Sequence, residues 1–343
     1  MRCIIFLWLL LPIQNFAQSD SIHQLFIEDK IKYENYEQKH RNHFQSKHSL
    51  IHYLTWGDPK DSPLIWLHGS FSNAYEIQPY VHELIANHIY VIAIDYYGHG
   101  KTKFPKTNVS VDHLAEDISQ LLSHLNIDKA IIGGFSRGAY LATSFYNNYP
   151  QKTRALILED GGIVGLHHNL KNKSKSELSD FINHENQNKP PTLFQEYDYE
   201  IDAYKALLRY SNSENSFINF SFIHRNDAGK YSIYKEQDFL YYMNDTDRFV
   251  EMILTPKKTS LFQQSLLKLG LQHSKNKLST PTLLLEAQSN KDPLPYDKEY
   301  ENFYNKNSYF VKHLIYDDTD HNIHFQHPKR FERDVINFIK STL

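Results

Sequence analysis

The sequence predicts an α/β protein built on a doubly wound, mostly parallel sheet. Short continuous apolar runs, such as 63–67, 90–94 and 130–132, are typical of strands that are buried on both faces. Helical patterns alternate with these runs, most clearly over 111–125, where leucine and isoleucine recur on one face. Such alternation indicates a parallel sheet whose ligands bind at the carboxyl ends of the strands.

Composition limits the classes of function. The 343-residue chain is 41% hydrophobic and 14% aromatic, enough for a sizeable core. Its formal charge of −3 gives no global attraction to nucleic acid or to an anionic membrane, and we expect neither as a partner. No motif calls for a cofactor, and none is expected. The oligomeric state leaves no readable motif.

The first 17 residues resemble a secretory signal. Arg2 gives a positive start, an apolar stretch of about eleven residues follows, and Ala17 is a small residue suited to cleavage before Gln18. The apolar stretch is too short to span a bilayer. Because Cys3 is the only cysteine, the mature chain would hold no thiol and no disulfide. We expect export to a bacterial periplasm or secretion.

The stretch 127–150 carries the strongest functional signal. An apolar strand over 130–132 leads into Gly134-Phe135-Ser136-Arg137-Gly138, and a helix then runs to just before Pro150. Strand, Gly-x-Ser-x-Gly turn and helix together are the setting of a nucleophile elbow, which presents Ser136 in strained backbone above the sheet. A dinucleotide-binding loop is disfavoured because Phe135 stands where the backbone would approach a pyrophosphate.

Strands and helices are expected on both sides of this turn. Upstream, the predicted strands are 50–56, 63–67 and 90–95, the predicted helices are 75–86 and 111–125, and residues 18–47 form an N-terminal extension. Downstream, strands are predicted over 154–160, 281–287 and 310–316, with a helix over 328–339. Between 163 and 279 the parallel pattern disappears; helices are expected at 204–210 and 239–243, and a hairpin around 226–230.

Four segments together resemble serine hydrolases of the α/β-hydrolase superfamily, in the branch of esterases, lipases and carbon–carbon-bond hydrolases. These segments are His68-Gly69-Ser70-Phe71, residues 95–100, the turn at 134–138, and a histidine block at 320–327. Tyr97 departs from the arginine often found there, which affects that loop alone. The resemblance implies an α/β-hydrolase core in two parts, 48–162 and 280–343, with an inserted, mainly helical lid over 163–279.

The same resemblance implies site residues. Ser136 would be the nucleophile and His321 the base, with the backbone N–H groups of Ser70 and Arg137 forming the oxyanion hole. The usual spacing of the acid falls on Asn290, so Asp292 is the expected acid. The alternative is an acid at the end of the strand before the lid, either Glu159 or Asp160.

These expectations lead to a function. We expect hydrolysis of a small-molecule ester through an acyl-enzyme, with amide, thioester or carbon–carbon cleavage as alternatives on the same machinery. Haloalkane and epoxide chemistry is disfavoured because those relatives carry a carboxylate where Ser136 stands. Asn290 leaves open a catalytically silent binding protein. His68 is expected to hold its loop, Asp95 and His99 likewise, and the histidine block lacks a metal-binding helix motif. The residues that bind substrate are not readable from the sequence.

Overall fold

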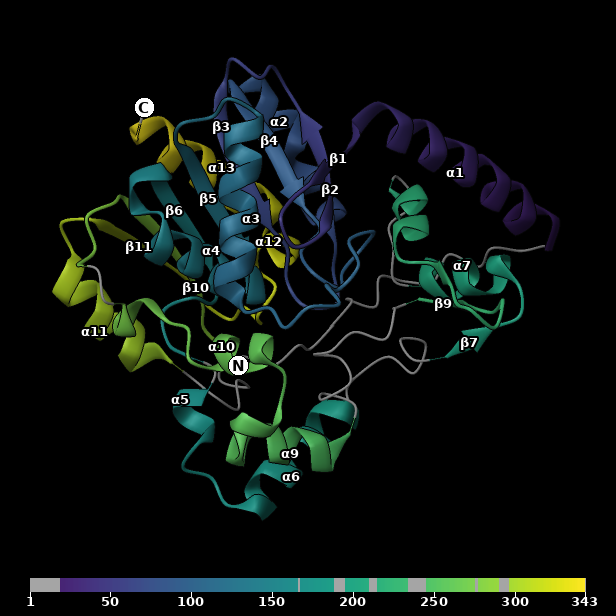
Figure 1. Ribbon diagram of the computed structural model, residues 1–343. Coiled ribbons are helices and arrows are strands. Elements are labelled where there is room, and N and C mark those ends of the chain that lie inside the picture. Colours follow the sequence, from purple (N-terminus) through teal and green to yellow (C-terminus); the bar gives the residue numbers. More distant parts are fainter. Residues whose placement is uncertain are drawn as a thin grey trace.

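An eight-stranded sheet forms the centre of the molecule (Figure 1). The computed structural model describes residues 19–165, 167–187, 195–209, 215–233, 245–274, 277–289 and 296–342. The strands lie in the order β1-β2-β4-β3-β5-β6-β10-β11. Their bounds are β1 (Arg41–Gln45), β2 (Leu50–Trp56), β3 (Ser62–Leu67), β4 (Ile89–Ile94), β5 (Ala130–Phe135), β6 (Thr153–Glu159), β10 (Thr282–Ala287) and β11 (Val311–Tyr316). β2 runs antiparallel to β1 and β4, and the strands from β4 to β11 pair in parallel.

The winding of the chain directs attention to the ends of β3 and β5. From β3 the chain moves outwards to β4 and then returns to β5 on the other side of β3. The connections that follow β3 and β5 therefore leave the sheet in opposite directions, and such a reversal is where open α/β sheets bind ligands. The predicted nucleophile turn directly follows β5.

Helices cover both faces of the sheet, as the doubly wound class requires. Consecutive residues of β3 enter different cores: Ile65 and Leu67 one, Leu64 and Trp66 the other. The first core is covered by α3 (Val111–His124), α4 (Arg137–Asn148), α10 (Leu261–Leu267) and α11 (Asp297–Asn307). The second is covered by the 3₁₀ helix η1 (Ala74–Tyr80), α2 (Val81–Ala86) and α13 (Pro328–Ser341).

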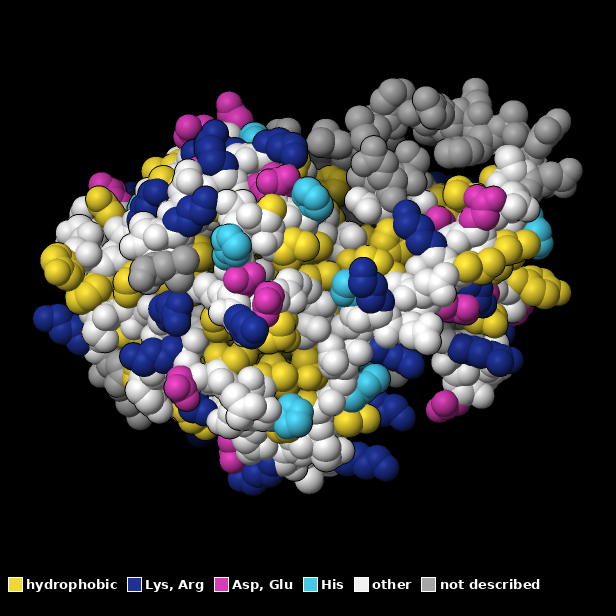
Figure 2. Space-filling view, turned by 90° about the horizontal axis from the view of Figure 1, so that it is seen from above, with side chains coloured by type: hydrophobic (Ala, Val, Ile, Leu, Met, Phe, Trp, Pro, Cys, Tyr) yellow, Lys and Arg dark blue, Asp and Glu magenta, His cyan; other side chains and the backbone are white. Residues whose placement is uncertain are grey.

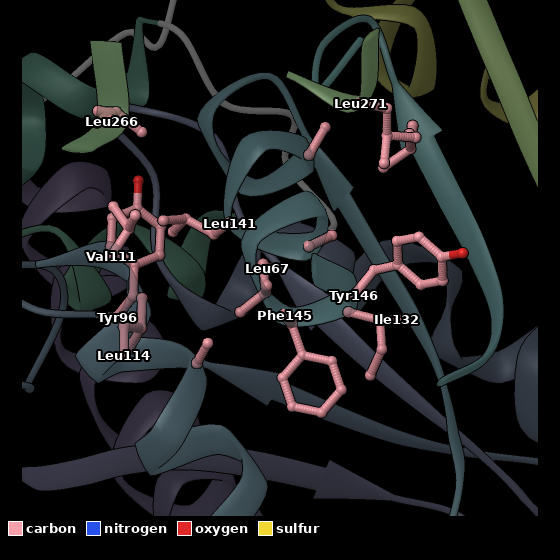
Figure 3. Close-up of a cluster of buried hydrophobic side chains, with 14 of the residues drawn as sticks. Leu67, Tyr96, Val111, Leu114, Ile132, Leu141, Phe145, Tyr146, Leu266 and Leu271 are labelled. Atoms are coloured by element: carbon pink, nitrogen blue, oxygen red, sulfur yellow. The ribbon is translucent and has the colours of Figure 1, made fainter. Parts of the chain in front are cut away.

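The helix after the turn is held tightly against the sheet. Figure 3 shows Leu141, Phe145 and Tyr146 of α4 in the same apolar cluster as Ile132 of β5. Phe145 and Tyr146 are fully buried, as are their neighbours on α3. Because this packing fixes α4 relative to β5, the turn between them has little freedom to relax.

One predicted helix is built differently from the expectation. The sequence pattern over 75–86 indicates a single helix, but the chain forms η1 and then α2. Pro79 lies inside η1 and has no backbone N–H to donate, so a continuous α-helical ladder cannot pass through it.

The segment between β6 and β10 forms two groups of elements (Figure 1). One is helical, with α5 (His167–Leu170), α6 (Lys175–Gln187), α9 (Thr246–Leu254), α10 and the 3₁₀ helices η5 (Pro256–Lys258) and η6 (Leu271–His273). The other contains α7 (Glu200–Leu208), the 3₁₀ helix η4 (Ser216–Ser221) and a small sheet of β7 (Glu196–Tyr197), β8 (His224–Arg225) and β9 (Tyr231–Ser232). The expected hairpin is thus present as β8 and β9, with a third strand beside it; residues 239–243 lie outside the described residues.

The N-terminal extension is a long helix followed by an edge strand. Helix α1 (Ser19–His40) lies beside the second group, where Phe26 contacts Phe220 and the Tyr204 hydroxyl donates to Asp29 at 2.5 Å. Residues 41–45, which the sequence analysis assigned to the extension, form β1 because they pair along the exposed edge of β2. None of the described helices is long and apolar enough to cross a membrane.

Charged side chains of both signs are interspersed over the face seen in Figure 2. Neither lysine and arginine nor aspartate and glutamate form a large uninterrupted area in that view. This distribution agrees with the small net charge of −3.

Candidate active site

The turn between β5 and α4 holds Ser136 in strained backbone. Its φ of 51° and ψ of −114° lie outside the regions that residues with a side chain normally occupy. Such a conformation costs on the order of 1–3 kcal/mol and persists only where the surroundings enforce it. They do so here: a Cβ on Gly138 would lie 1.8 Å from the carbonyl oxygen of Leu67, so only glycine lets α4 approach the end of β3.

His321 connects Ser136 to a carboxylate. The Nε2 atom of His321 lies 2.7 Å from the Ser136 hydroxyl oxygen, and its Nδ1 lies 2.7 Å from Oδ2 of Asp160. All three side chains are buried, with exposed fractions of 8% or less. With Nδ1–H donating to the carboxylate, Nε2 carries no proton and accepts a hydrogen bond from the Ser136 hydroxyl.

Asp160 reaches His321 because the chain bends directly after β6. Its φ of 46° is left-handed, a conformation that aspartate tolerates better than most residues. The Asp160 N–H donates to the carbonyl of Leu285, and its Oδ1 accepts the N–H of Ala287 at 3.1 Å. One contact with β10 thus anchors the Asp160 backbone and the other its carboxylate, whose remaining oxygen, Oδ2, contacts the imidazole.

The structure describes two of the three candidate acids. Asp292, and Asn290 before it, lie outside the described residues. Of the two alternatives, Asp160 is the one on His321, whereas Glu159 accepts two hydrogen bonds from His324, from its N–H and from Nδ1, both at 2.8 Å. Within the described residues, the carboxylate that hydrogen-bonds the His321 imidazole directly follows β6.

The loop after β3 lies next to the start of α4. The Nδ1–H of His68 donates to the carbonyl of Gly69 at 2.7 Å, and its ring stacks on Tyr96. Burial lowers the pKa of His68 to about 4, so this imidazole is neutral. His68 thus holds the loop that carries Ser70.

The two predicted oxyanion donors lie on these neighbouring segments. Arg137 is the first residue of α4, whose leading N–H groups have no acceptor within the helix. Ser70 is buried in the loop after β3, next to Gly69, whose own N–H donates to Glu76. No ligand marks the position of an oxyanion, so the roles of Ser70 and Arg137 stay predictions.

Asp95 serves the loop after β4. Its carboxylate accepts the N–H groups of Ala74 and Lys101 and pairs with His52 at 2.7 Å. Tyr97, which stands where the related enzymes often have arginine, donates its hydroxyl to Asp117 at 2.5 Å. The contacts of Asp95 thus tie the loop after β4 to Ala74 and to His52 of β2.

Sequence reasoning missed the role of Glu159 and His324. Glu159 and Asp160 are adjacent acids, and each forms a hydrogen bond with one of two histidines three residues apart, His324 and His321. The sequence contains the signal for these two pairs, but it can be recognised only when both segments are placed at the same edge of the sheet. The sequence pattern around His324 suggests only a block of histidines; among the described residues, no group of three or more potential metal ligands occurs.

The fold and this edge define the class of protein. The sheet order, a serine with positive φ between β5 and α4, and a large insertion after β6 are features of α/β hydrolases. The family model described as alpha/beta hydrolase fold matches residues 62–328, and the chain belongs to this family.

Individual relatives are more distant. An uncharacterized protein of Mycobacterium bovis is 38% identical over 84 residues, which cover 24% of this chain and 25% of that protein. A soluble epoxide hydrolase of Corynebacterium is 34% identical over 110 residues, 32% of this chain and 37% of the enzyme. The chain thus matches about a quarter to two fifths of the length of these curated relatives.

Solved structures extend the likeness over the whole fold. A marine microorganism esterase superposes with a TM-score of 0.57 at 19% identity, covering 84% of this chain and 98% of the esterase. At that identity the likeness concerns the fold alone.

Proposed function

We propose that the chain is a serine hydrolase that cleaves a carboxylic ester of a small molecule. One observation carries the proposal: the continuous hydrogen-bond chain from the strained Ser136 through His321 to Asp160. A serine hydroxyl is a weak nucleophile at neutral pH and needs an adjacent base, itself oriented by an acid. In this proposal Ser136 is the nucleophile, His321 the base and Asp160 the acid, and their hydrogen bonds support these roles.

The proposed reaction proceeds in two halves. The Ser136 hydroxyl oxygen attacks the ester carbonyl carbon while His321 Nε2 takes its proton. The tetrahedral oxyanion accepts hydrogen bonds from the N–H groups of Ser70 and Arg137, each worth about 3–4 kcal/mol of barrier. The carbon–oxygen bond to the alcohol then breaks, and His321 delivers the proton to the departing alkoxide.

Water completes the cycle. His321 removes a proton from the water as its oxygen attacks the acyl-enzyme, and the proton then returns to Ser136 as the acid is released. Asp160 keeps the imidazole in the Nδ1–H tautomer and stabilises its charged form throughout. Atoms balance with ester and water as the only reactants, so the proposal includes no cofactor.

The alternatives differ in what supports them. Amide, thioester or carbon–carbon cleavage would use the same residues, and a substrate panel distinguishes them. Epoxide hydrolysis, for which one relative is named, is disfavoured because a serine stands at the nucleophile position. The hypothesis of a catalytically silent binding protein depends on Asn290 at the usual position of the acid. If Asp160 supplies the acid, Asn290 no longer supports that hypothesis.

A probe and a matched pair of variants test the proposal. We expect the wild-type chain to react with a fluorophosphonate and to hydrolyse short p-nitrophenyl esters, and we expect Ser136→Ala to do neither. Ser144→Ala is the control: Ser144 is a buried serine of α4, the helix that follows Ser136, and its hydroxyl donates to Asp112. Equal behaviour of the wild type and Ser136→Ala, or absence of labelling in the wild type, would refute a serine mechanism.

We also propose that the chain is exported after removal of residues 1–17. Support comes from the positive start, the short apolar stretch and the small residue Ala17. These residues lie outside the described part of the chain.

A further inference from the structure

A second acid–histidine pair lies beside the Ser136–His321–Asp160 chain. Glu159 ends β6, and His324 lies in the short helix α12 (Ile323–Gln326), three residues after His321. Oε1 of Glu159 accepts both the backbone N–H and the Nδ1–H of His324, each at 2.8 Å. Glu159 is fully buried and His324 is 8% exposed. Glu159 at the end of β6 and Asp160 directly after it thus hold His324 and His321 of the same segment.

The second pair shares a wall with the first. The ring of Phe135 contacts both imidazoles, with centroids 4.8 Å from His321 and 4.9 Å from His324. Phe135 is also the cross-strand neighbour of Glu159 and the residue before Ser136. A displacement of His324 would therefore change the packing around the nucleophile and the base together.

The pair also connects to the loop that carries the predicted oxyanion donor. Glu76 of η1 accepts the N–H of Gly69 and the indole N–H of Trp66, both at 3.0 Å. Tyr80, in the same 3₁₀ helix, donates its hydroxyl to the carbonyl of His324 at 2.5 Å. One short helix thus bridges the 68–70 loop and the segment that carries His321.

Charge reinforces these contacts. Burial alone would lower the pKa of His324, but the carboxylates of Glu159 and Glu76 outweigh it and raise that pKa. Burial raises the pKa of Glu76, and His324 is the largest influence in the opposite direction. The carboxylates of Glu159 on β6 and Glu76 on η1 thus both favour the charged form of His324 on α12.

We propose that Glu159 and His324 are positioning residues, which act together with Glu76 to hold His321 against Ser136 and to align the 68–70 loop. This inference rests on the proposed hydrolase function. The pair transfers no proton to or from substrate in this proposal; it keeps the reacting atoms at their distances, where displacement of about 1 Å costs on the order of 100-fold in rate.

The test compares variants at position 324. His324→Ala removes the Nδ1 donor and the imidazole, and we expect kcat to fall about 10- to 100-fold while KM changes less than about threefold. His324→Asn places an amide donor near the position of Nδ1, and we expect it to recover most of the lost kcat. His313→Ala is the control, because it removes another buried histidine–carboxylate pair, with Glu286, and should leave kcat unchanged.

A second readout does not depend on turnover. The Nδ1 proton of His321, held by Asp160, should give a low-field NMR signal. We expect this signal to be sharp in the wild type and broadened or lost in His324→Ala. If His324→Ala does not fold, Glu159→Gln takes its place: the amide oxygen can still accept both hydrogen bonds, and we expect an intermediate loss of kcat with the same change in the NMR signal.

The outcomes separate the two proposals. A wild type that neither labels nor turns over would refute the hydrolase function, and the NMR comparison would still decide the positioning role. A folded His324→Ala with kcat within twofold of the wild type and an unchanged His321 signal would overturn the positioning role alone. A His324→Asn variant as slow as His324→Ala at equal stability would overturn it as well.

Discussion

The sequence offers three candidate acids for His321: Asp292, Glu159 and Asp160. Between the adjacent Glu159 and Asp160, the local backbone conformation determines which one contacts His321. Asp160 reaches His321 because its φ of 46° bends the chain directly after β6. Glu159, one residue earlier, serves a different histidine. A single positive φ at the end of a strand thus divides two adjacent carboxylates between two imidazoles.

This division gives a prediction for the acid. We expect Asp160→Asn to lower kcat about 1,000- to 10,000-fold, because the amide no longer fixes the reactive tautomer or stabilises the charged imidazole. Glu159→Gln should cost far less, since Glu159 does not touch His321. Ester turnover and fluorophosphonate labelling rates measure the difference.

The control for that comparison is Asp292→Asn, which we expect to behave like the wild type. The opposite ranking, with Asp292→Asn inactive and Asp160→Asn active, would return the acid to the loop after β10. It would also leave the hydrogen bond between Asp160 and His321 without a catalytic purpose.

At the scale of elements, helix α1 is bound to the core by a buried charge network. Glu37 near its end accepts the Tyr75 hydroxyl at 2.6 Å, pairs with Lys101, and lies 3.8 Å from His52. His52 in turn pairs with Asp95, which holds the loops after β3 and β4. The same helix contacts η4, and Ser221 of η4 accepts a hydrogen bond from Asn73 beside the 68–70 loop. α1 therefore joins the insertion to the edge of the site.

The network predicts a pH window for stability. Burial alone would lower the pKa of His52, but Asp95 and Glu37 outweigh it and raise that pKa to about 9. The pKa of Glu37 is lowered to about 2, because His52, Lys101 and Tyr75 together outweigh its burial. His52 thus stabilises the fold fully below about pH 6.5, its ordinary pKa, and loses that contribution as pH rises to about 9. Glu37 contributes above about pH 4.5 and loses its contribution towards pH 2.

We therefore expect the midpoint temperature of thermal unfolding to decrease as the pH rises from 6.5 to 9. We expect it to decrease also as the pH is lowered below 4.5. Circular dichroism melts across this range measure it. His52→Asn is the matched variant: it should unfold at a lower temperature at pH 6 and show little further fall up to pH 9. An unfolding temperature of the wild type that rises over pH 6.5–9 would contradict the assigned network.

At the scale of the whole molecule, hydrophobic periodicity and turn residues predict much of the fold. The buried runs that mark β3, β4, β5 and β6, and the helix pattern of α3 and α4, predict the α/β sheet because each element is patterned locally. The Gly-x-Ser-x-Gly turn likewise identifies Ser136 from its neighbours alone. The fold class and the hydrolase family were predictable on that basis.

What the sequence could not predict depends on contacts between distant residues. β1 is a strand because β2 offers an unpaired edge, and its own five residues carry no strong strand signal. The hydrogen bond of Asp160 to His321 depends on a backbone bend, on the carbonyl of Leu285 and on the N–H of Ala287, and none of these leaves a pattern in the sequence. The hydrogen bond between Glu159 and His324 joins two segments that are far apart in the sequence, so the sequence alone does not predict it.

The final prediction concerns the mature molecule. We expect the chain, expressed in a bacterium with its own leader, to be cleaved between Ala17 and Gln18, since a small residue is required before the cut. Cys3 is the only cysteine, so cleavage leaves a product without a thiol. Intact mass spectrometry after maleimide treatment should therefore find no adduct on the exported chain. Ala17→Lys should block cleavage and retain a chain that takes up one maleimide. Recovery of an exported wild-type chain that still reacts through Cys3 would show that the first 17 residues are kept, and the export proposal would then require an anchored rather than a released protein.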